Sequence, residues 1–183
     1  MRNIFLGLIF SLMLPPVAAF AKNDTLTTYG DVMQFALPAG AFGYSVLEGD
    51  TEGQKELLRD LVASMALTEA TKYATNNTYL GRRPGKSNSG HAFPSGHTTS
   101  ACAGSGYLGK RYGWEYGLPA FGLAALTGYS RVDADEHHWR DVIAGCGISY
   151  LMTGFFVTKE GAENLNPVIG PDFIGFRWDL PFN

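Results

Sequence analysis

The sequence predicts an all-α protein, a single helical bundle of about five to six helices that ends in an irregular C-terminal tail. Apolar residues recur at three-to-four spacing in several segments, most clearly in residues 51–75. The alternation of apolar and polar residues that is typical of half-buried strands is scarce. The 183 residues contain no internal repeat and no low-complexity tract, and they are enough for one domain with a sizeable core.

The first residues, MRNIFLGLIFSLMLPPVAAFA, predict a secretory signal peptide rather than part of the fold. Arg2 gives a positive start, Ile4–Leu14 an apolar run, and Ala19–Ala21 a small-residue cleavage motif. An uncleaved anchor is the alternative, but the apolar run is short for a membrane span. We expect cleavage after Ala21, which leaves residues 22–183 as one domain in a bacterial periplasm.

The first two helical segments differ in regularity. Residues 27–48 are largely apolar but contain Pro38 and Gly40, so we expect a broken helix there. From Thr51 the apolar residues recur on one face as far as Lys72–Thr75. Thr51 itself is the expected N-cap of this second helix.

A loop rich in Gly, Asn and Arg, NNTYLGRRPGKSNSGHAF, precedes three further helices. We expect these helices from Ser95 to about Arg111, from Leu118 to about Tyr129, and from Glu136 to about Val157. The tail KEGAENLNPVIGPDFIGFRWDLPFN is rich in turn residues and is expected to be irregular or to contain a short strand.

The charge balance limits the classes of function. Of the 14 Lys and Arg residues, Arg2 lies in the leader, which leaves 13 positive residues against 17 Asp and Glu residues. A mildly acidic chain is a poor candidate for sequence-independent nucleic-acid binding. The longest uncharged and largely apolar stretch after the leader, Val142–Thr158, is only marginal as a membrane span, so we expect a soluble protein or one with peripheral membrane contact. Arg111 and Arg140 are interpreted as ordinary helix-end cations.

The two cysteines, Cys102 and Cys146, are too few for a disulfide scaffold or a CxxC metal site. On helices, each would lie five residues past a candidate catalytic group, His97 or Asp141. We therefore expect both side chains to point away from the site and to pack as small hydrophobic groups. Export permits a disulfide between them, and that alternative stays open because helix angles alone do not fix their distance.

The segment GHAFPSGHTTSACAG, residues 90–104, contains the first half of a candidate site. Pro94 discourages helix before it, and Ser95 is a good N-cap, so a helix is expected to begin here. Gly96 lets the backbone come close to a ligand, and the N–H groups and dipole of a helix start suit phosphate. His97 would then lie in the first turn beside the bound group. A capped, buried helix with a structural histidine is the alternative.

The segment GYSRVDADEHHWRDVIAG, residues 128–145, contains the second half. His137 and Asp141 are four residues apart and share one face if the segment is helical. A carboxylate one turn away fixes the tautomer of an imidazole and makes its other nitrogen more nucleophilic. Arg131 supplies a permanent, forked cation that suits phosphate oxygens. A purely structural pair is the alternative reading of His137 and Asp141.

Together the two segments resemble the type 2 phosphatidic acid phosphatase (PAP2) superfamily, which also includes bacterial class A acid phosphatases and vanadium haloperoxidases. The signature of that superfamily has three blocks, K-x6-R-P, P-S-G-H and S-R-x5-H-x3-D. The second block matches residues 94–97, and the third matches Ser130–Asp141, at every fixed position. The resemblance implies a helical bundle of the same type.

The first block departs from the pattern, because ten residues rather than six separate Lys72 from Arg83. An insertion of four residues in the loop 76–82 accounts for the difference, since loops absorb insertions at little cost. Arg83 is favoured as the arginine of this block because it precedes Pro84, and Arg82 remains its rival.

The resemblance implies a phosphatase that needs no metal and no cofactor. In that scheme His137 attacks phosphorus to form a phosphohistidine, and Asp141 orients His137. His97 protonates the leaving alkoxide and then activates the water that hydrolyses the intermediate. The groups that would hold the phosphoryl oxygens are Lys72, Arg83, Ser95, Gly96 and Arg131.

Other functions stay open at this point. A vanadium-dependent haloperoxidase would share the motifs, but those enzymes resemble two bundles in a much longer chain. A non-catalytic binder of phosphate or a lipid headgroup would tolerate the loss of His137, yet every proposed chemical residue is present. A metal hydrolase is weaker, because no HExxH or comparable spacing occurs. Whether the substrate is a lipid phosphate or a soluble phosphomonoester is undecided, as is the oligomeric state.

Overall fold

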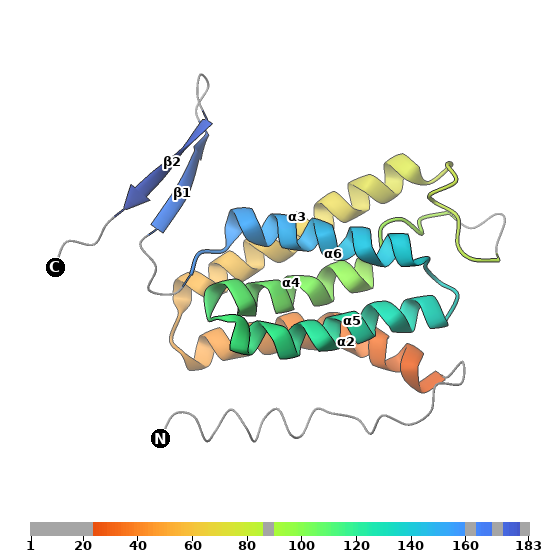
Figure 1. Cartoon of the computed structure of the whole chain (residues 1–183), viewed down its shortest axis with the longest axis horizontal. Helices are drawn as coiled ribbons and strands as arrows, with labels where there is room; N and C mark the ends of the chain where they lie inside the picture. Colours follow the sequence, from red (N-terminus) through yellow and green to blue (C-terminus); the bar gives the residue numbers. More distant parts are fainter. Residues whose placement is uncertain (1–23, 86–89, 160–163, 170–173, 180–183) are drawn as a thin grey trace.

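The computed structural model describes residues 24–85, 90–159, 164–169 and 174–179. Within these ranges the elements, labelled in Figure 1, are α2 (Asp24–Leu47), α3 (Thr51–Thr75), α4 (Gly96–Arg111), α5 (Trp114–Asp133), α6 (Trp139–Phe156), β1 (Asn164–Ile169) and β2 (Ile174–Asp179). The predicted helical bundle is confirmed. The signal peptide predicted for residues 1–21 lies outside the described residues.

Helix α4 is the centre of the bundle and packs against α2, α3, α5 and α6. Nearly all of its residues are buried, because its many Gly, Ala, Ser and Thr residues let four neighbouring helices approach it closely. The apolar core between α2, α4 and α5 consists of Met33, Leu37, Ala101, Cys102, Ala120 and Ala124. The PSGH motif, the first half of the candidate site, lies at the start of this central helix.

Helix α2 is continuous, so the break expected at Pro38 and Gly40 is wrong. Proline lacks the N–H that would bond to the carbonyl of Gln34, four residues earlier. That carbonyl instead accepts a hydrogen bond of 2.5 Å from the hydroxyl of Ser100 in α4. A tertiary contact thus satisfies the group that the proline leaves unpaired.

The N-cap of α3 and the start of α5 differ from the predictions by one and four residues. Asp50 rather than Thr51 caps α3, and its Oδ1 accepts a 2.8 Å hydrogen bond from the backbone N–H of Gly53. Helix α5 begins at Trp114, four residues before the predicted start. Gly113 adopts a φ of 118°, which favours glycine, and turns the chain directly from α4 into α5.

The C-terminal tail contains an antiparallel hairpin, so the expected irregular structure is wrong for residues 164–169 and 174–179, whereas the alternative of a short strand is confirmed. Strands β1 and β2 pair in register from Asn164 opposite Asp179 to Ile169 opposite Ile174. Of the turn-forming residues behind that expectation, Gly170, Pro171 and Asp172 stand in the sequence between the two strands, whereas Pro167 and Gly175 lie within them. The bundle is helical as predicted, and the hairpin is a β element that follows the bundle in the sequence.

Cys102 of α4 and Cys146 of α6 form a disulfide, with their Cα atoms 5.3 Å apart. The expectation that they pack as separate hydrophobic groups is therefore wrong. That expectation used angles around each helix and contained no information on the distance between the helices. The small residues of α4 let α6 come close enough for the bond to form.

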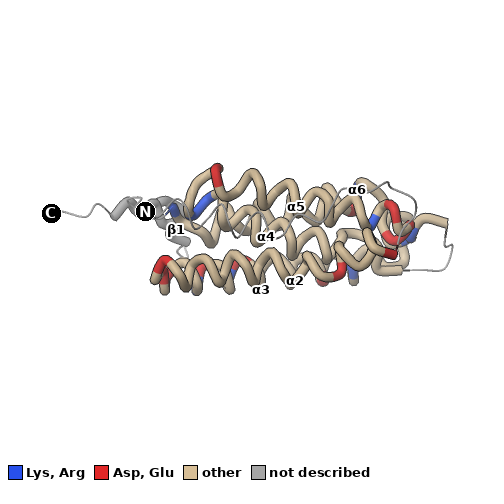
Figure 2. The backbone as a smooth tube through the Cα atoms, turned by 90° about the horizontal axis from the view of Figure 1, so that it is seen from below, with Lys and Arg blue, Asp and Glu red and all other residues tan. Residues whose placement is uncertain are grey.

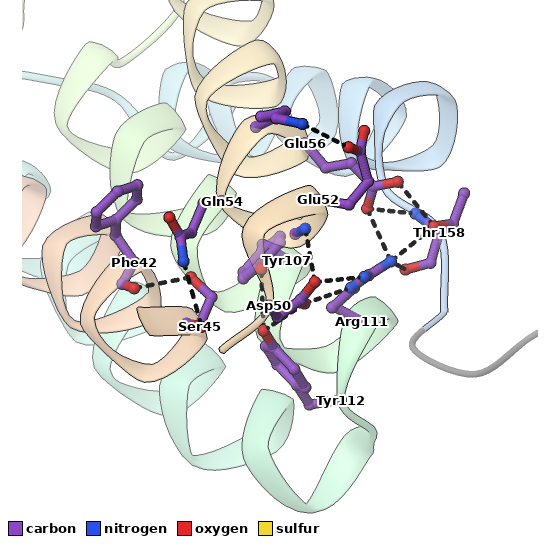
Figure 3. Close-up of polar contacts among 12 residues, drawn as sticks. Phe42, Ser45, Asp50, Glu52, Gln54, Glu56, Tyr107, Arg111, Tyr112 and Thr158 are labelled. Atoms are coloured by element: carbon purple, nitrogen blue, oxygen red, sulfur yellow. Dashed lines mark hydrogen bonds and ion pairs between the residues drawn. The ribbon is translucent and has the colours of Figure 1, made fainter. Parts of the chain in front are cut away.

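A buried polar network joins α3, α4 and the chain that follows α6 at the end of the bundle where α4 stops (Figure 3). Arg111 donates to both carboxylate oxygens of Asp50, at 2.7 and 2.8 Å, and to Glu56 at 3.2 Å. Tyr112 donates to Asp50 at 2.7 Å, and the Thr158 hydroxyl donates to Glu56 at 2.7 Å. Arg111 is thus a buried ion-pair partner rather than an ordinary helix-end cation.

Charged residues lie toward the two ends of the bundle, as Figure 2 shows. Between these ends, α2, α5 and α6 carry exposed apolar side chains, and α5 packs against both of the other two helices. We use the name apolar face for these exposed side chains, which include Val32, Phe35, Leu118, Phe121, Ile143 and Leu151. In the part of the chain that the structure describes, no helix combines the length and apolarity needed to cross a membrane.

Candidate active site

The start of α4 is anchored to α6. Ser95 is the N-cap of α4, and its hydroxyl oxygen accepts the backbone N–H of Thr98 at 3.4 Å. The backbone N–H of Ser95 donates to the carbonyl oxygen of Asp141 at 2.9 Å. A Cβ atom at Gly145 would lie 2.5 Å from the Ser95 carbonyl oxygen, so only glycine lets α6 come this close. The predicted helix start at the PSGH motif is confirmed.

His97 lies in the first turn of α4 and faces α2 and α5. Its Nε2 lies 2.9 Å from Oδ1 of Asp31, and Nη1 of Arg131 donates to the same oxygen at 2.7 Å. Burial and the positive charge of Arg131 lower the pKa of His97, and the charge of His137 adds to this lowering. The hydrogen bond and negative charge of Asp31 act in the opposite direction. His97 therefore lies within electrostatic range of the other candidate groups.

Arg131 occupies the last turn of α5, and its side chain is almost fully buried. Its Nε donates to the hydroxyl of Ser130 at 3.1 Å, and its Nη2 donates to the backbone carbonyl of Thr27. With Asp31 on Nη1, these contacts hold the guanidinium in one orientation. A fixed, desolvated guanidinium is suited to bind an oxyanion.

His137 precedes α6 rather than lying on it, because the helix begins at Trp139. The prediction that His137 and Asp141 share a helical face is therefore wrong. The two side chains nevertheless lie close to each other. Nδ1 of His137 lies 3.6 Å from Oδ2 of Asp141, slightly longer than a hydrogen bond, and has no hydrogen-bond partner among the described residues. The backbone N–H of His137 donates to the Arg131 carbonyl at 3.1 Å, so the turn after α5 positions the ring. Contacts between candidate catalytic groups can be long in the absence of substrate and tighten when substrate binds.

Asp141 is fully buried, and both of its carboxylate oxygens accept hydrogen bonds. Oδ2 accepts the backbone N–H of His138 at 2.8 Å, and Oδ1 accepts from Nε of Arg140 at 3.3 Å. Arg140 also stacks over the ring of Tyr79 at 4.5 Å and donates to the Tyr79 carbonyl at 3.3 Å. Arg140 thus connects the loop after α3 to the Asp141 carboxylate, which is more than the helix-end role predicted for it.

Lys72 lies beside the PSGH motif in spite of its unusual spacing from Arg83. It stands in the last turn of α3, where its Nζ lies 2.7 Å from Oε1 of Glu69. A Cβ atom added at Gly96 would lie 3.1 Å from the same Nζ. The side chain of Lys72 is mostly buried, so its ammonium group is held next to the first residue of α4.

Arg83 and Arg82 differ in their surroundings. Arg83 forms an ion pair with Glu136, the residue before His137, and both side chains are about one-third exposed. Arg82 is exposed. Arg83 is therefore tied to the segment that carries His137, which favours it as the arginine of the first block.

The predicted residues thus come together at the end of the bundle where α4 begins, from α3, the loop after it, α4, α5, the turn before α6 and the first turn of α6. Three carboxylates that pair with the predicted cations Lys72, Arg83 and Arg131 were not predicted as site residues from the sequence. These carboxylates are Asp31, Glu69 and Glu136. Glu69 could have been found from its spacing of three residues before Lys72 on a helix. Asp31 gives no such signal, because it stands 100 residues before Arg131.

Comparisons with known proteins point to one family. The family model described as the PAP2 superfamily matches residues 57–164. The Lipid A 4'-phosphatase of Helicobacter pylori strain J99 is 31% identical over 96% of this chain and 92% of its own length. The Lipid A 1-phosphatase of the same strain is 31% identical over 66% of this chain and 63% of its own length.

A solved structure shares the fold. The crystal structure of Aquifex aeolicus LpxE superposes with a TM-score of 0.60, over 83% of this chain and 92% of that chain. At 19% sequence identity, this likeness concerns the fold alone.

Proposed function

We propose, from the premise that this chain belongs to the PAP2 superfamily and is a phosphoric monoester hydrolase, that it removes a phosphate group from a lipid through a phosphohistidine intermediate. The family match covers residues 57–164, which include all three signature blocks, and confirms the resemblance inferred from the motifs. The mechanism, the substrate and the cellular location are the parts that we propose.

The observation that carries this proposal is the meeting of the three signature blocks around the start of α4. The Ser95–Asp141 backbone hydrogen bond joins the second block to the third. The approach of Lys72 to Gly96 joins the first block to the second. Residues far apart in the sequence thus surround one helix N-terminus, which is itself suited to hold an anion.

The nucleophile in this scheme is Nε2 of His137. Its Nδ1 faces the buried carboxylate of Asp141, which favours the tautomer with the proton on Nδ1 and leaves Nε2 as the free base. As Nε2 forms the P–N bond, positive charge grows on the imidazole ring. The Asp141 carboxylate stabilises that charge.

The general acid in this scheme is His97. As the P–O bond to the leaving group breaks, the leaving oxygen takes a proton from His97. The neutral His97 then takes a proton from the water that attacks the phosphohistidine, and the P–N bond breaks. Its lowered pKa makes neutral His97 accessible at moderate pH, as the second half of the cycle requires.

The phosphoryl oxygens would be bound by protein cations and by the start of α4. Arg131 is fixed and desolvated, and Lys72 lies beside Gly96. Arg83 approaches from the loop through its ion pair with Glu136. Because these groups supply the positive charge, we propose that hydrolysis requires no metal ion and no cofactor.

We propose that the substrate is a phosphate monoester on a lipid, with lipid A as the first candidate. The support is the similarity to the Lipid A 4'-phosphatase over nearly the whole of both chains. The apolar face gives independent support. Phe35 of α2, Leu118 of α5 and Ile143 of α6 are 69%, 61% and 67% exposed, and such an area of apolar side chains marks an interaction site.

We further propose that the apolar face rests against membrane lipid, with the charged end that holds the site at the level of the headgroups. In sequence, residues 32–47, 116–130 and 142–158 contain no charge, so no charged group of these segments would enter hydrocarbon. Binding to vesicles of bacterial phospholipid would fall for Phe35→Asp and Ile143→Asp. It would be unchanged for Val62→Asp, a control at an exposed position on the charged helix α3.

We also propose export to the periplasm. The leader-like first residues and the Cys102–Cys146 disulfide, which suits an oxidising compartment, support this location. Amino-terminal sequencing of the protein from a periplasmic fraction should begin after Ala21. A full-length cytoplasmic protein would contradict it.

The test of function is phosphate release by the purified protein in EDTA, from lipid A, detergent-dispersed phosphatidic acid and an aryl phosphate. We expect chelator-resistant hydrolysis that prefers the lipids and that falls at least about 1,000-fold in His137→Ala. His138→Ala is the matched control, because the neighbouring ring is not assigned to the chemistry. Preference for the aryl phosphate would indicate a soluble substrate. No hydrolysis, with bound vanadate and peroxide-dependent bromide oxidation, would indicate a haloperoxidase, and phosphate binding without turnover would indicate a binder.

A further inference from the structure

Asp31 of α2 is a carboxylate of the site that lies outside the three signature blocks. Its Oδ1 lies 2.9 Å from Nε2 of His97 and 2.7 Å from Nη1 of Arg131. One oxygen atom therefore bridges the proposed general acid and a proposed phosphate ligand. We infer that Asp31 is a positioning residue that holds Nε2 of His97, so that Nδ1 of the same ring faces the leaving group. This inference rests on the proposed function.

The packing of α2 against α5 brings Asp31 to this place. A Cβ atom at Gly30, the residue before Asp31, would lie 2.6 Å from Nη2 of Arg131 and closer still to the Ser130 hydroxyl. Glycine at position 30 therefore permits the approach. One turn earlier, the carbonyl of Thr27 accepts a hydrogen bond from the same guanidinium. The first two turns of α2 thus form part of the site wall.

Each of the two histidines then has a carboxylate of its own. Asp141 faces Nδ1 of His137, and Asp31 contacts Nε2 of His97. A carboxylate on one imidazole nitrogen fixes the ring orientation and leaves the other nitrogen for the substrate. Nδ1 of His97 would give its proton to the leaving oxygen and later take one from the attacking water. Asp31 makes no bond to the substrate and acts through His97.

The electrostatic surroundings of His97 make the charge of Asp31 important. His97 faces Arg131 from α5 and His137 from the turn before α6, and Lys72 of α3 lies beside the preceding residue, Gly96. These groups disfavour a second positive charge on the ring. Asp31 opposes them and raises the pKa of His97, so its removal is expected to lower that pKa further.

The test compares leaving groups. We would measure kcat/KM of the full-length protein, wild type, Asp31→Ala and Asp31→Asn, on an alkyl phosphate and on nitrophenyl phosphate. An alkoxide needs a proton to leave, whereas nitrophenolate leaves without one. In Asp31→Ala, Arg131 keeps its contacts with Ser130 and Thr27, so phosphate binding should change little. The variant should therefore lower kcat/KM at least about tenfold for the alkyl phosphate and by less than about threefold for nitrophenyl phosphate.

Two further variants sharpen this comparison. Asp31→Asn keeps an oxygen acceptor without the charge, so its alkaline limb of kcat/KM should move to lower pH. Asp24→Asn makes the same change at an exposed position at the start of α2 and should behave as wild type. An equal loss on both substrates, or a loss on neither, would overturn the inference.

A readout that is independent of turnover separates this inference from the proposed function. Nitrogen-15 NMR of the imidazole rings should show His97 protonated on Nε2 in the wild type at neutral pH. In Asp31→Ala, that tautomer preference should weaken and the pKa of His97 should fall. If His137→Ala were fully active, the proposed function would fail, but these spectra would still test whether Asp31 sets the tautomer and the pKa of His97. An unchanged tautomer and pKa in Asp31→Ala would reject the role of Asp31 alone.

Discussion

The backbone N–H of Ser95 donates a 2.9 Å hydrogen bond to the backbone carbonyl of Asp141. This bond joins the start of the central helix α4 to the start of α6. It uses main-chain atoms only, so the side chain of Asp141 can be changed without removing the connection. The proposed catalytic contribution of that side chain can therefore be tested separately from the packing of the two helices.

Asp141→Asn should lower kcat at least about 100-fold, because an amide cannot stabilise the charge that develops on His137. The measurement is steady-state phosphate release, accompanied by a thermal unfolding curve to confirm folding. Asp135→Asn is the matched control, since Asp135 is exposed and its φ of 55° suits asparagine equally. A kcat within about threefold of wild type in Asp141→Asn would contradict the assigned role.

Arg83→Ala and Arg82→Ala form a matched pair that identifies the arginine of the first block. Arg83 pairs with Glu136 beside His137, whereas Arg82 is exposed. We expect kcat/KM to fall by about 100-fold for Arg83→Ala and by less than about twofold for Arg82→Ala. The opposite order would assign the role to Arg82.

Asp60 should make the stability of the bundle depend on pH. Burial raises the pKa of Asp60 to about 6, although hydrogen bonds from Thr153 and Ser64 and the charge of Lys110 act to lower it. Because the folded state favours the protonated form, this contribution is present below about pH 4 and is lost as the pH rises through about 6. The difference is about 3 kcal/mol of unfolding free energy.

Urea unfolding of wild type and Asp60→Asn at pH 4 and pH 7 measures this contribution. Between these pH values, the stability of the asparagine variant relative to wild type should rise by about 2 kcal/mol, because the unfolded carboxyl is already partly ionised at pH 4. Asp135→Asn again serves as the control for a change of charge. A difference between wild type and Asp60→Asn that does not vary with pH would show that Asp60 is ionised in the folded protein.

The disulfide should stabilise the folded chain without taking part in the chemistry. Cys102 and Cys146 are 44 residues apart in sequence, for which the chain-entropy relation gives about 4 kcal/mol. The Cys102→Ala, Cys146→Ala double variant should lose about this amount in urea unfolding, while kcat changes less than about threefold at a temperature where it is folded. An unfolding free energy equal to that of the wild type would refute the stabilising role.

Local signals were sufficient to predict the helices and the capped start of α4. Pro94, Ser95 and the small residues that follow lie together in the sequence, so the helix start at Ser95 could be predicted. The continuity of α2 could not, because it depends on the bond between Ser100 and Gln34, two residues on different helices. The disulfide was missed for the same reason, since it depends on the distance between α4 and α6.

For the site, the signature motifs predicted which residues come together but not what surrounds them. The position of Lys72 agrees with an insertion in the loop that follows α3. Asp31 stands 66 residues before His97, and no sequence spacing connects the two. Its place in the site depends on the packing of α2 against α5, which the sequence does not predict.

The central claim is that His137 carries the phosphoryl group, and trapping that intermediate tests it most directly. His97→Ala should accumulate the intermediate from an aryl phosphate, because that leaving group departs without an acid while hydrolysis of the P–N bond lacks its base. After denaturation at alkaline pH, peptide mass spectrometry should find a phosphoryl group on His137, and none in the His97→Ala, His137→Ala double variant. A phosphoryl group on another residue, or full activity in His137→Ala, would contradict the account.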